Sequence, residues 1–487
     1  MSQQAKLDFK VFKRLLVFAK NYKRYLVLTL LFTIFVGFLA PIRPIVIGEI
    51  VNRFIVNTQD KSALTLWILI LVGISFAEGI FQFLSSYFSN LMAQSIILDI
   101  RKKLYAHLLK FRIKYFDKTP IGNLVTRLVS DIEAISDVFS SGLISIVGDL
   151  LLLVVVLVLM LVSNWQLALL SLAPIPLLIW ATRIFARAMR KSFQLERQQV
   201  TRLNTFVQEH LSGMSIVQLF NREKQEYEKF KVINAGHRQA HINAVWAFSI
   251  FFPVVEFLSS LSIAFLLVWG GLYAMNGAND MSAMFGEIFA FTLWIGMLFR
   301  PIRQLADKFN VLQRGIVRAE RVFEVLDMDE TDQENGSVST VDFNQDITFE
   351  NVYFAYKDEN WILKDINLTI PQGKMVAFVG ATGAGKSTIV NLLTRFYSFQ
   401  KGHIRIGNTC IKDIDLQHLR KNIAIVLQDV FLFSDTIFNN ITLNNPNITK
   451  EQVIEASKAV GAHDFIMKLP NNYDYEMGER GGVLSVG

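Results

Sequence analysis

The stretch GATGAGKS, residues Gly380–Ser387, matches the pattern G-x-x-x-x-G-K-S. In this pattern the glycines let the backbone wrap around phosphate groups with its N–H groups pointing inward, while the lysine reaches the β and γ oxygens and the final hydroxyl ligates Mg²⁺. The apolar run Met375–Val379 before the loop is predicted to be a strand, and Ser387–Arg395 a helix. Since the pattern requires a strand, a loop and a helix in this order, the stretch predicts a nucleotide-binding site.

Outward from the loop, short apolar or alternating runs separated by helical patterns predict a soluble α/β domain. The acidic, polar segment Asp327–Gln345, which contains Gly336, marks a linker before this domain, and Ile316–Leu326 before it is predicted to be a helix. The expected domains are therefore 1–326, a linker 327–345, and 346–487. Besides Met375–Val379, the expected strands are Ile347–Tyr353, Ile366–Ile370, Ile404–Ile406 and Ile423–Val426.

The first two thirds of the chain carry most of its apolar residues. Of the 487 residues, 52% are hydrophobic and only 19% are charged, which excludes a disordered chain, and the single Cys410 excludes an intramolecular disulfide. A helix needs about 20 apolar residues to cross a bilayer. Six segments reach that length, which excludes a soluble phosphate-loop kinase or GTPase. They are Tyr25–Ile47, Leu64–Ser85, Phe139–Val162, Leu167–Phe185, Ala244–Met275 and Met281–Phe299.

The Lys and Arg residues lie on alternate sides of these spans. The segment before the first span and the connections after the second and fourth spans are basic, whereas the turns 163–166 and 276–280 contain no Lys or Arg. Positive charge favours the cytoplasmic side, so both termini are predicted to be cytoplasmic. This placement accounts for the net charge of +7 and leaves little support for nucleic-acid binding.

Two of the cytoplasmic connections are too long for simple loops. No Gly or Pro occurs between Gly79 and Pro120, and an amphipathic, charged pattern runs from Pro176 to Gly213. A helix of about 40 residues is about 60 Å long, twice the hydrocarbon thickness. We therefore expect long helices that project into the cytosol.

Together these features resemble the ATP-binding-cassette (ABC) exporters of the half-transporter type. The resemblance implies a six-helix membrane domain followed by an α/β nucleotide-binding domain, here incomplete. Three further stretches carry it: YFDKTPIGNLVTRLVSD (Tyr115–Asp131) resembles the first intracellular loop, LSGMSIVQLFNRE (Leu211–Glu223) the second coupling-helix region, and RAERVFEVLD (Arg318–Asp327) the segment that enters the cassette.

The resemblance also implies which residues hold ATP and Mg²⁺. Tyr356 would stack on adenine, although a lone tyrosine is more often a packing residue. IAIVLQDVFLF (Ile423–Phe433) resembles the Q-loop, and the competing interpretation makes this run with Asp429 a Walker B strand. The expected metal ligands are Ser387 and Gln428. The expected ATP contacts are Tyr356, Gly380, Ala381, Thr382, Gly383, Ala384, Gly385, Lys386, Ser387, Thr388, Gln428, Ser485 and Gly487.

The sequence departs from the family pattern near its last residue. The usual LSGGQ signature reads Leu484-Ser485-Val486-Gly487, so Val486 either alters this half-site or is a tolerated variation. No Walker B aspartate, catalytic glutamate or switch histidine follows, so no catalytic residue is assigned and the chain is expected to be a fragment of a longer one. The alternative function is a weakly hydrolysing, ATP-binding regulatory subunit of a heterodimeric exporter.

The expected function is ATP-driven export of a hydrophobic or amphipathic substrate, such as a drug, lipid or peptide, across the cytoplasmic membrane. The expected partners are membrane lipid and a second half-transporter, in a homodimer or a heterodimer. Four acidic residues fall within the spans: Glu78, Asp149, Glu256 and Glu287. Such residues are candidates for function, although several lie near helix ends, where solvation is a simpler explanation. Glu256, after Pro253, would favour a cationic amphipathic substrate.

Overall fold

A computed structural model describes residues 9–57, 61–275, 281–331, 335–357, 360–427 and 431–478. The chain forms two compact units, Met1–Thr331 and Asp332–Gly487, which are treated separately below.

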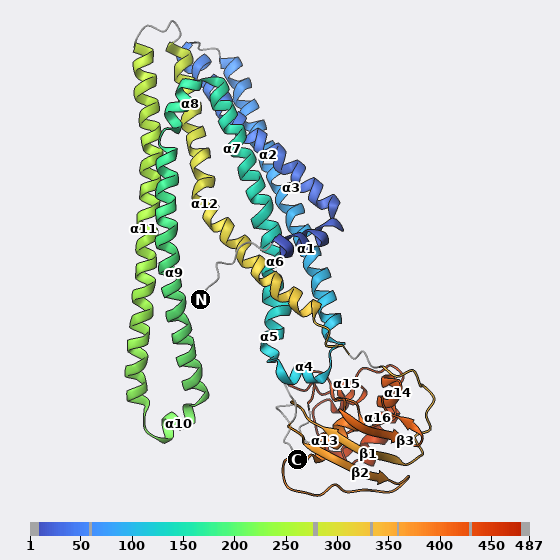
Figure 1. Cartoon of the computed structure of the whole chain (residues 1–487). Coiled ribbons are helices and arrows are strands. Elements are labelled where there is room, and N and C mark those ends of the chain that lie inside the picture. The colour runs from blue at the N-terminus through green and yellow to red at the C-terminus, as the bar shows by residue number, and fades with distance from the viewer. Residues whose placement is uncertain are drawn as a thin grey trace. The chain divides into compact units, whose positions relative to one another are not determined.

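Every element of the first unit that has assigned bounds among its described residues is a helix (Figure 1). Six of its helical segments are long and apolar enough to cross a membrane, so the six-helix membrane domain predicted from the sequence is confirmed. We call this part the membrane unit. Its elements are α1 (Phe9–Lys20), α2 (Lys23–Ile50), η1 (Val51–Asn57), α3 (Lys61–Leu108), α4 (Ile113–Lys118), α5 (Ile121–Thr126), η2 (Arg127–Asp131), α6 (Ile132–Asp137), η3 (Val138–Leu143), α7 (Ile144–Ser163), α8 (Trp165–Leu172), α9 (Ile175–Ser212), α10 (Met214–Leu219), α11 (Glu223–Met275) and α12 (Met281–Asp327).

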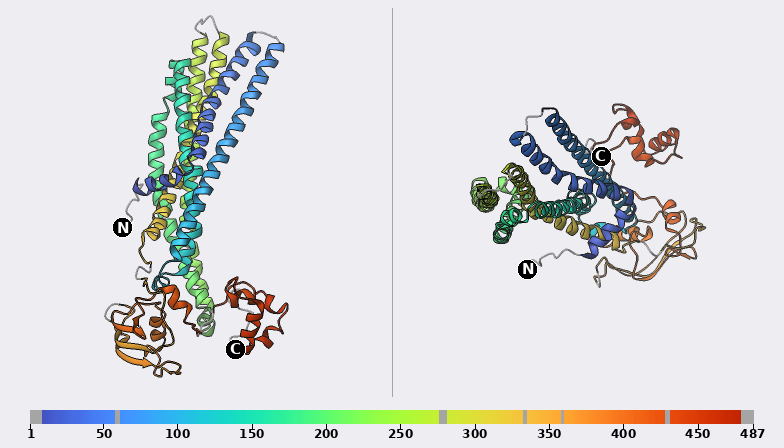
Figure 2. Two further views of the ribbon diagram at one scale, coloured as in Figure 1. Left: turned by 90° about the vertical axis from the view of Figure 1, so that its right-hand side faces the viewer. Right: turned by 90° about the horizontal axis from the view of Figure 1, so that it is seen from above.

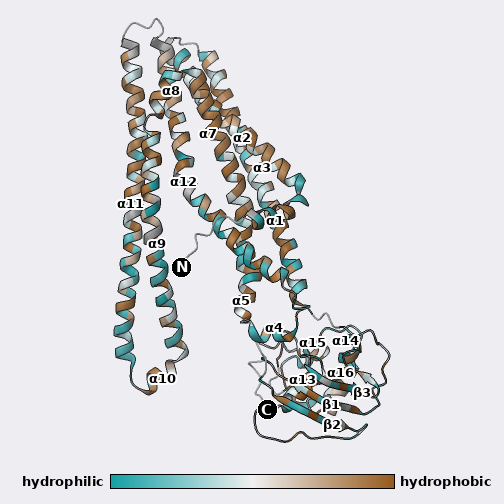
Figure 3. Cartoon of the chain, in the orientation of Figure 1, coloured by the Kyte–Doolittle hydropathy of each residue, from teal (hydrophilic) through white to brown (hydrophobic). Residues whose placement is uncertain are grey.

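Several of these helices extend far beyond a bilayer. At 1.5 Å per residue, the 53 residues of α11 span about 80 Å. Figure 2 shows α2 beside α3 and α9 beside α11, two pairs that are in contact along their lengths. In Figure 3 the apolar colour fills the upper part of the helices and gives way to polar residues toward α10. This distribution is the one expected of helices that cross a membrane and project out of it.

Two helix boundaries differ from the sequence prediction. Helix α3 ends at Leu108 rather than continuing toward Pro120, because the next residues pair with another segment: the Arg112 N–H donates to the Glu330 carbonyl at 3.0 Å, and Phe111 forms a β-bridge with Thr331. The helix expected at Ile316–Leu326 is instead the last part of α12, continuous with the sixth span.

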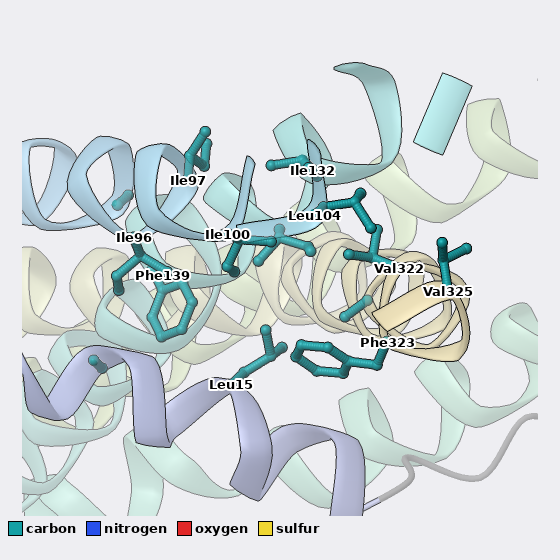
Figure 4. Packing of buried hydrophobic residues seen from close by; sticks show 14 of the residues in the cluster. Leu15, Ile96, Ile97, Ile100, Leu104, Ile132, Phe139, Val322, Phe323 and Val325 are labelled. Carbon is teal, nitrogen blue, oxygen red and sulfur yellow. The ribbon is translucent and has the colours of Figure 1, made fainter. Parts of the chain in front are cut away.

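The main core of the membrane unit joins α1, α3, α6 and α12. Leu15, Ile96, Ile100, Ile132 and Val322 are completely buried there (Figure 4). Complete burial of each such side chain contributes about 1.5–3 kcal/mol. The end of α12 is therefore packed firmly against α1 and α3.

Glycines let α12 approach its neighbours closely at two places. A Cβ at Gly286 would lie 2.3 Å from the carbonyl oxygen of Gly48 in α2, and a Cβ at Gly315 would lie 2.0 Å from a methyl group of Val138 in η3. Asn52 accepts a hydrogen bond from the Gly286 N–H at 2.9 Å beside the first contact. Any larger side chain at Gly286 would push α12 away from α2.

The second unit contains a four-stranded antiparallel sheet in the order β2-β1-β3-β4. Ile347 of β1 pairs with Ile370 of β2 on one side and with Ile406 of β3 on the other. We call this part the phosphate-loop unit. Its elements are β1 (Ile347–Phe354), β2 (Leu363–Ile370), α13 (Lys386–Leu393), β3 (Lys401–Ile406), β4 (Thr409–Cys410), α14 (Leu416–Lys421), α15 (Ile437–Thr442), α16 (Lys450–Ala459), α17 (His463–Ile466) and η4 (Asn472–Asp474).

Two of the expected strands, Met375–Val379 and Ile423–Val426, are not formed. Neither segment enters a ladder with another described residue. The Met375 and Val426 side chains are 99% and 97% exposed. A strand is stabilised by hydrogen bonds to a neighbouring strand and by burial of its apolar face. These segments have no partner strand among the described residues, and Phe378 and Ile423 are only partly buried against the core of the unit. The prediction of strands here was therefore wrong for this structure, whereas those within β1, β2 and β3 are confirmed.

Candidate nucleotide-binding site

The loop Gly380–Ser387 enters α13 through backbone conformations that favour glycine. Gly383 and Gly385 have φ angles of +86° and +87°, in the left-handed region. Gly385 also lies against β2, where a Cβ would come within 2.6 Å of a methyl group of Leu363. Two independent constraints, the positive φ and the contact with β2, therefore require glycine at this position.

The Lys386 side chain bends back over the loop. Its Nζ donates hydrogen bonds to the carbonyl oxygens of Gly380 at 2.8 Å and Ala381 at 2.9 Å. Because Lys386 is also the first residue of α13, its ammonium group lies near the positive end of the helix dipole. The exposed Ser387 hydroxyl lies in the same turn. This arrangement of loop, ammonium group and helix N-terminus is suited to binding phosphate groups.

Tyr356 lies close to the same helix. Its hydroxyl is 3.3 Å from Thr388 Oγ1 and accepts a hydrogen bond from the Asn391 side chain at 3.5 Å. Its ring makes edge contacts with Phe354 and Tyr397, with centroids 4.8 Å apart in both pairs. The structure thus brings Tyr356 to the loop, with contacts that fit a packing role as well as a binding role. Sequence reasoning missed Asn391, five residues after Lys386.

Three predicted site residues lie outside the described residues: Gln428, Ser485 and Gly487. The same holds for Val486 and for Asp429, on which the competing Walker B interpretation depended. The structure therefore brings together Tyr356 and the loop from Gly380 to Thr388, and their contacts with ATP stay a prediction.

The segment that follows residue 430 is held by a carboxylate cap. Asp435 accepts hydrogen bonds at 2.7 Å from the Asn439 side chain and from the Thr436 N–H at the start of α15. The Asn439 contact and then the Thr436 N–H lower the pKa of the Asp435 carboxyl, because both stabilise its charged form. The cap fixes the chain between the predicted Q-loop and α15.

In the membrane unit, the acidic residues Glu78, Asp149 and Glu287 have polar partners from other helices or a helix cap. Arg43 of α2 donates to Glu78 of α3 at 3.3 Å, and Lys308 of α12 forms an ion pair with Asp149 of α7. The third pair joins Asn164, the residue that caps α8, to Glu287 of α12 at 3.3 Å. Sequence reasoning found the acids but not these partners, since the contacts depend on how each helix is rotated.

A cavity lies between α11 and α12. It has a volume of about 460 Å³ and its described lining consists of Phe252, Arg300, Gln304 and Asp307. The three polar residues follow one another at intervals of four and three residues on α12, so they share one face of that helix. The cavity thus combines an aromatic ring with one positive and one negative charge.

Comparison with known proteins decides the family. The family described as "ABC transporter transmembrane region" matches residues 26–302, and the one described as "ABC transporter" matches residues 363–487. The chain belongs to the ABC transporters. The expectation that arose from the phosphate loop and the six spans is confirmed.

Relatives match almost the whole chain. The uncharacterized ABC transporter ATP-binding protein YknV of Bacillus subtilis is 32% identical over 97% of this chain and 78% of its own length. The ATP-dependent lipid A-core flippase of Syntrophus aciditrophicus is 32% identical over 98% of this chain and 78% of its own length. The putative multidrug export ATP-binding/permease protein YgaD of B. subtilis is 32% identical, over 98% and 83% respectively.

This ABC transporter is an exporter half-transporter, with one membrane domain and one ATP-binding domain in a single multi-pass chain. Its ATP-binding domain makes it an ATPase-coupled transporter. None of these relatives is described as a regulatory subunit, so the comparisons do not favour that alternative.

Proposed function

We propose that this ABC transporter forms a dimer, homodimer or heterodimer, that uses ATP to export a hydrophobic or amphipathic substrate across the cytoplasmic membrane. The observation that carries the proposal is the geometry at Lys386, whose ammonium group lies over a glycine loop at the start of α13 in a chain with six membrane spans. The proposed domains are 1–326 and 346–487 joined by a linker at 327–345, and both termini are cytoplasmic.

In the proposed mechanism, ATP lies between the loop Gly380–Thr388 of one subunit and Ser485 and Gly487 of the other, with Tyr356 against adenine. ATP can drive a conformational change only if it binds one conformation more tightly than another. A closed dimer supplies this difference, because only there does each nucleotide contact both subunits. Hydrolysis removes these contacts and resets the transporter.

We propose that Ser387 and Gln428 hold Mg²⁺ beside the phosphates. The exposed Ser387 hydroxyl lies in the first turn of α13, next to Lys386, which fits this assignment. Among the described residues, no group of three His, Cys, Asp or Glu side chains could hold a metal ion. Phosphate oxygens and water would supply the remaining ligands, as is usual for Mg²⁺ at phosphate sites.

For the substrate, we propose an amphiphile whose head group carries both charges. The cavity at α11 and α12 offers Phe252 to an apolar chain and the charged Arg300 and Asp307 to a head group. A lipid A-core flippase and a putative multidrug exporter among the relatives are in keeping with an amphiphile. In proteoliposomes we expect Arg300→Gln to slow transfer of fluorescent phosphatidylethanolamine several-fold and Arg314→Gln, on the same helix, to leave it unchanged. Equal rates in both variants would remove the cavity from the proposal.

The test of nucleotide binding is Lys386→Ala, with Lys374→Ala as the matched control. Lys374 is an exposed lysine outside the loop. A hydrogen bond to a charged group contributes about 1.5–3 kcal/mol, so we expect Lys386→Ala to weaken ATP binding roughly 10- to 100-fold and Lys374→Ala to change it less than twofold. Fluorescent ATP analogues report the affinity in the purified protein. Equal affinity in both variants would refute the proposed site.

Two substitutions at Tyr356 separate stacking from packing. Aromatic stacking on a base is worth about 1–3 kcal/mol, so Tyr356→Ala should weaken ATP binding at least fivefold while Tyr356→Phe retains it. If Tyr356→Phe weakens binding as much as Tyr356→Ala does, the hydroxyl contact with Thr388 is what matters and stacking is excluded.

A further inference from the structure

Four side chains fasten α1 to the end of α12. Arg14 donates two parallel hydrogen bonds to the Asp327 carboxylate, from Nη1 to Oδ2 at 2.5 Å and from Nη2 to Oδ1 at 2.7 Å. Its Cζ lies 4.3 Å from the centroid of the Phe323 ring. The Phe18 ring is nearly parallel to the Phe323 ring, with the two centroids 6.1 Å apart and an angle of 12° between the rings. We call Arg14, Phe18, Phe323 and Asp327 the α1 clasp.

The α1 clasp packs against buried side chains of the core. Leu15, the residue after Arg14, is completely buried, and Phe323 is 3% exposed. Figure 4 shows the Leu15 side chain beside Phe323. Because Phe323 is packed into the core, its ring offers the Arg14 guanidinium a fixed surface to lie against. A planar guanidinium that stacks on a ring and binds a carboxylate with two bonds is the geometry in which Lys cannot replace Arg.

The residues directly after Asp327 form hydrogen bonds with residues at and just beyond the end of α3. The Met328 carbonyl oxygen is 3.0 Å from His107 Nε2, and the Glu330 carbonyl accepts a hydrogen bond from the Arg112 N–H at 3.0 Å. A β-bridge joins Thr331 to Phe111. The chain that leaves α12 is therefore attached first to α1 and then to α3 before it continues into the phosphate-loop unit.

We propose that the α1 clasp is a positioning element of the transport reaction, through which the nucleotide state of the cassette is passed to the membrane helices. The segment 327–331 is the covalent path between the two units, so a pull on it reaches α1 and α3 only if its attachments hold. The inference rests on the proposed ATP-driven conformational change. The rival explanation is a plain surface ion pair, since the Arg14 and Asp327 side chains are 39% and 58% exposed. Such a pair typically contributes little to stability.

The test follows the membrane unit while ATP binds to the full chain. A fluorophore is attached at Ser163→Cys, an exposed position at the end of α7, after Cys410→Ser has removed the single native cysteine. We expect ATP to change the emission of this parent protein. Arg14→Ala should reduce that change at least threefold, while the Kd for ATP changes less than twofold.

The matched control is Lys231→Ala in α11. Lys231 also pairs with a carboxylate, Glu228 at 2.7 Å, and also lies over an aromatic ring, Tyr227 at 5.1 Å, but all three residues belong to one helix. This variant removes the same types of contact without separating two elements. We therefore expect its ATP-dependent emission change to equal that of the parent.

Rescue variants separate a positioning role from a loss of folding. Arg14→Lys, which keeps the charge but loses the two-bond geometry, should give an intermediate emission change. Arg14→Glu combined with Asp327→Arg, which restores a pair of opposite charges, should recover at least half of the parent's change. Full emission change in Arg14→Ala, or no recovery in the exchanged pair when it melts as the parent does, would overturn the proposal. A parent that binds no ATP would instead refute the proposed function.

Discussion

The ion pair between Asp149 and Lys308 gives the sharpest prediction, because its two residues come from different membrane helices. Their side chains are 19% and 17% exposed. Removing one partner of a fully buried pair costs about 3–5 kcal/mol, and a single charge at the centre of a membrane helix costs about 2.5–3.5 kcal/mol. Since a fifth of each side chain is still exposed, we expect Asp149→Leu or Lys308→Met alone to lower the free energy of unfolding by about 2–3 kcal/mol.

The double variant should be far less destabilised than the sum of the single ones. With both charges replaced by apolar side chains of similar size, the free energy of unfolding should fall by only about 1 kcal/mol, because replacement of a buried pair by apolar residues is often neutral. The sum of the single effects is about 4–6 kcal/mol, so the coupling energy should be about 3 kcal/mol or more.

The assay is reversible unfolding in mixed micelles at increasing fractions of dodecyl sulfate, followed by circular dichroism. The exposed pair Arg53–Glu49, which is also in the membrane unit, serves as a reference and should show a coupling energy of about 0.3–0.5 kcal/mol. A coupling energy for Asp149 and Lys308 as small as that reference would refute the reasoning. It would mean that water reaches both charges and that the pair does not hold α7 to α12.

Two further predictions concern packing and acid stability. Gly286→Ala should lower the melting temperature by several degrees, because its Cβ would lie 2.3 Å from a backbone oxygen. Gly271→Ala, with no atom within 4 Å of the added Cβ, should not lower it. Equal melting temperatures in the two variants would contradict the close approach of α12 to α2. The lowered pKa of the Asp435 carboxyl contributes stability that is present above its unfolded pKa of about 3.9 and is lost as the pH falls through the folded value. In Asp435→Asn the melting temperature should therefore depend less on pH below about pH 5. An unchanged slope in that variant would show that the cap does not affect acid stability.

The sequence predicted best those features that depend on local pattern. The six spans were predicted from hydropathy alone. The loop at Gly380–Ser387 was predicted from its glycines and its lysine, all of which lie within eight residues of one another. Features that depend on a distant partner were not predictable. Helix α3 ends at Leu108, in a stretch without Gly or Pro, because Phe111 and Arg112 pair with residues more than 200 positions away.

The strand predicted at Met375–Val379 also depends on a partner elsewhere in the chain, and there the prediction failed. Its composition favours a strand, yet a strand forms only where a neighbour accepts its hydrogen bonds. The site was likewise predicted where its chemistry is local, at Lys386 and the glycines. The support given to Tyr356 by Asn391 depends on how α13 is rotated, which the pattern of residues did not reveal.

The ion pairs within the spans have a consequence for how the protein enters the membrane during synthesis. Arg43 and Glu78 lie in the first and second spans, so they can enter the bilayer together as a helical hairpin with their charges already paired. Asp149 precedes Lys308 by 159 residues, which take roughly 10 to 30 s to translate at about 5–20 residues per second. For that time the Asp149 carboxylate has no Lys308 to pair with, and a lone charge at the centre of a membrane helix costs about 2.5–3.5 kcal/mol. The order of the helices along the chain thus delays charge pairing in the third span until the sixth span has been made.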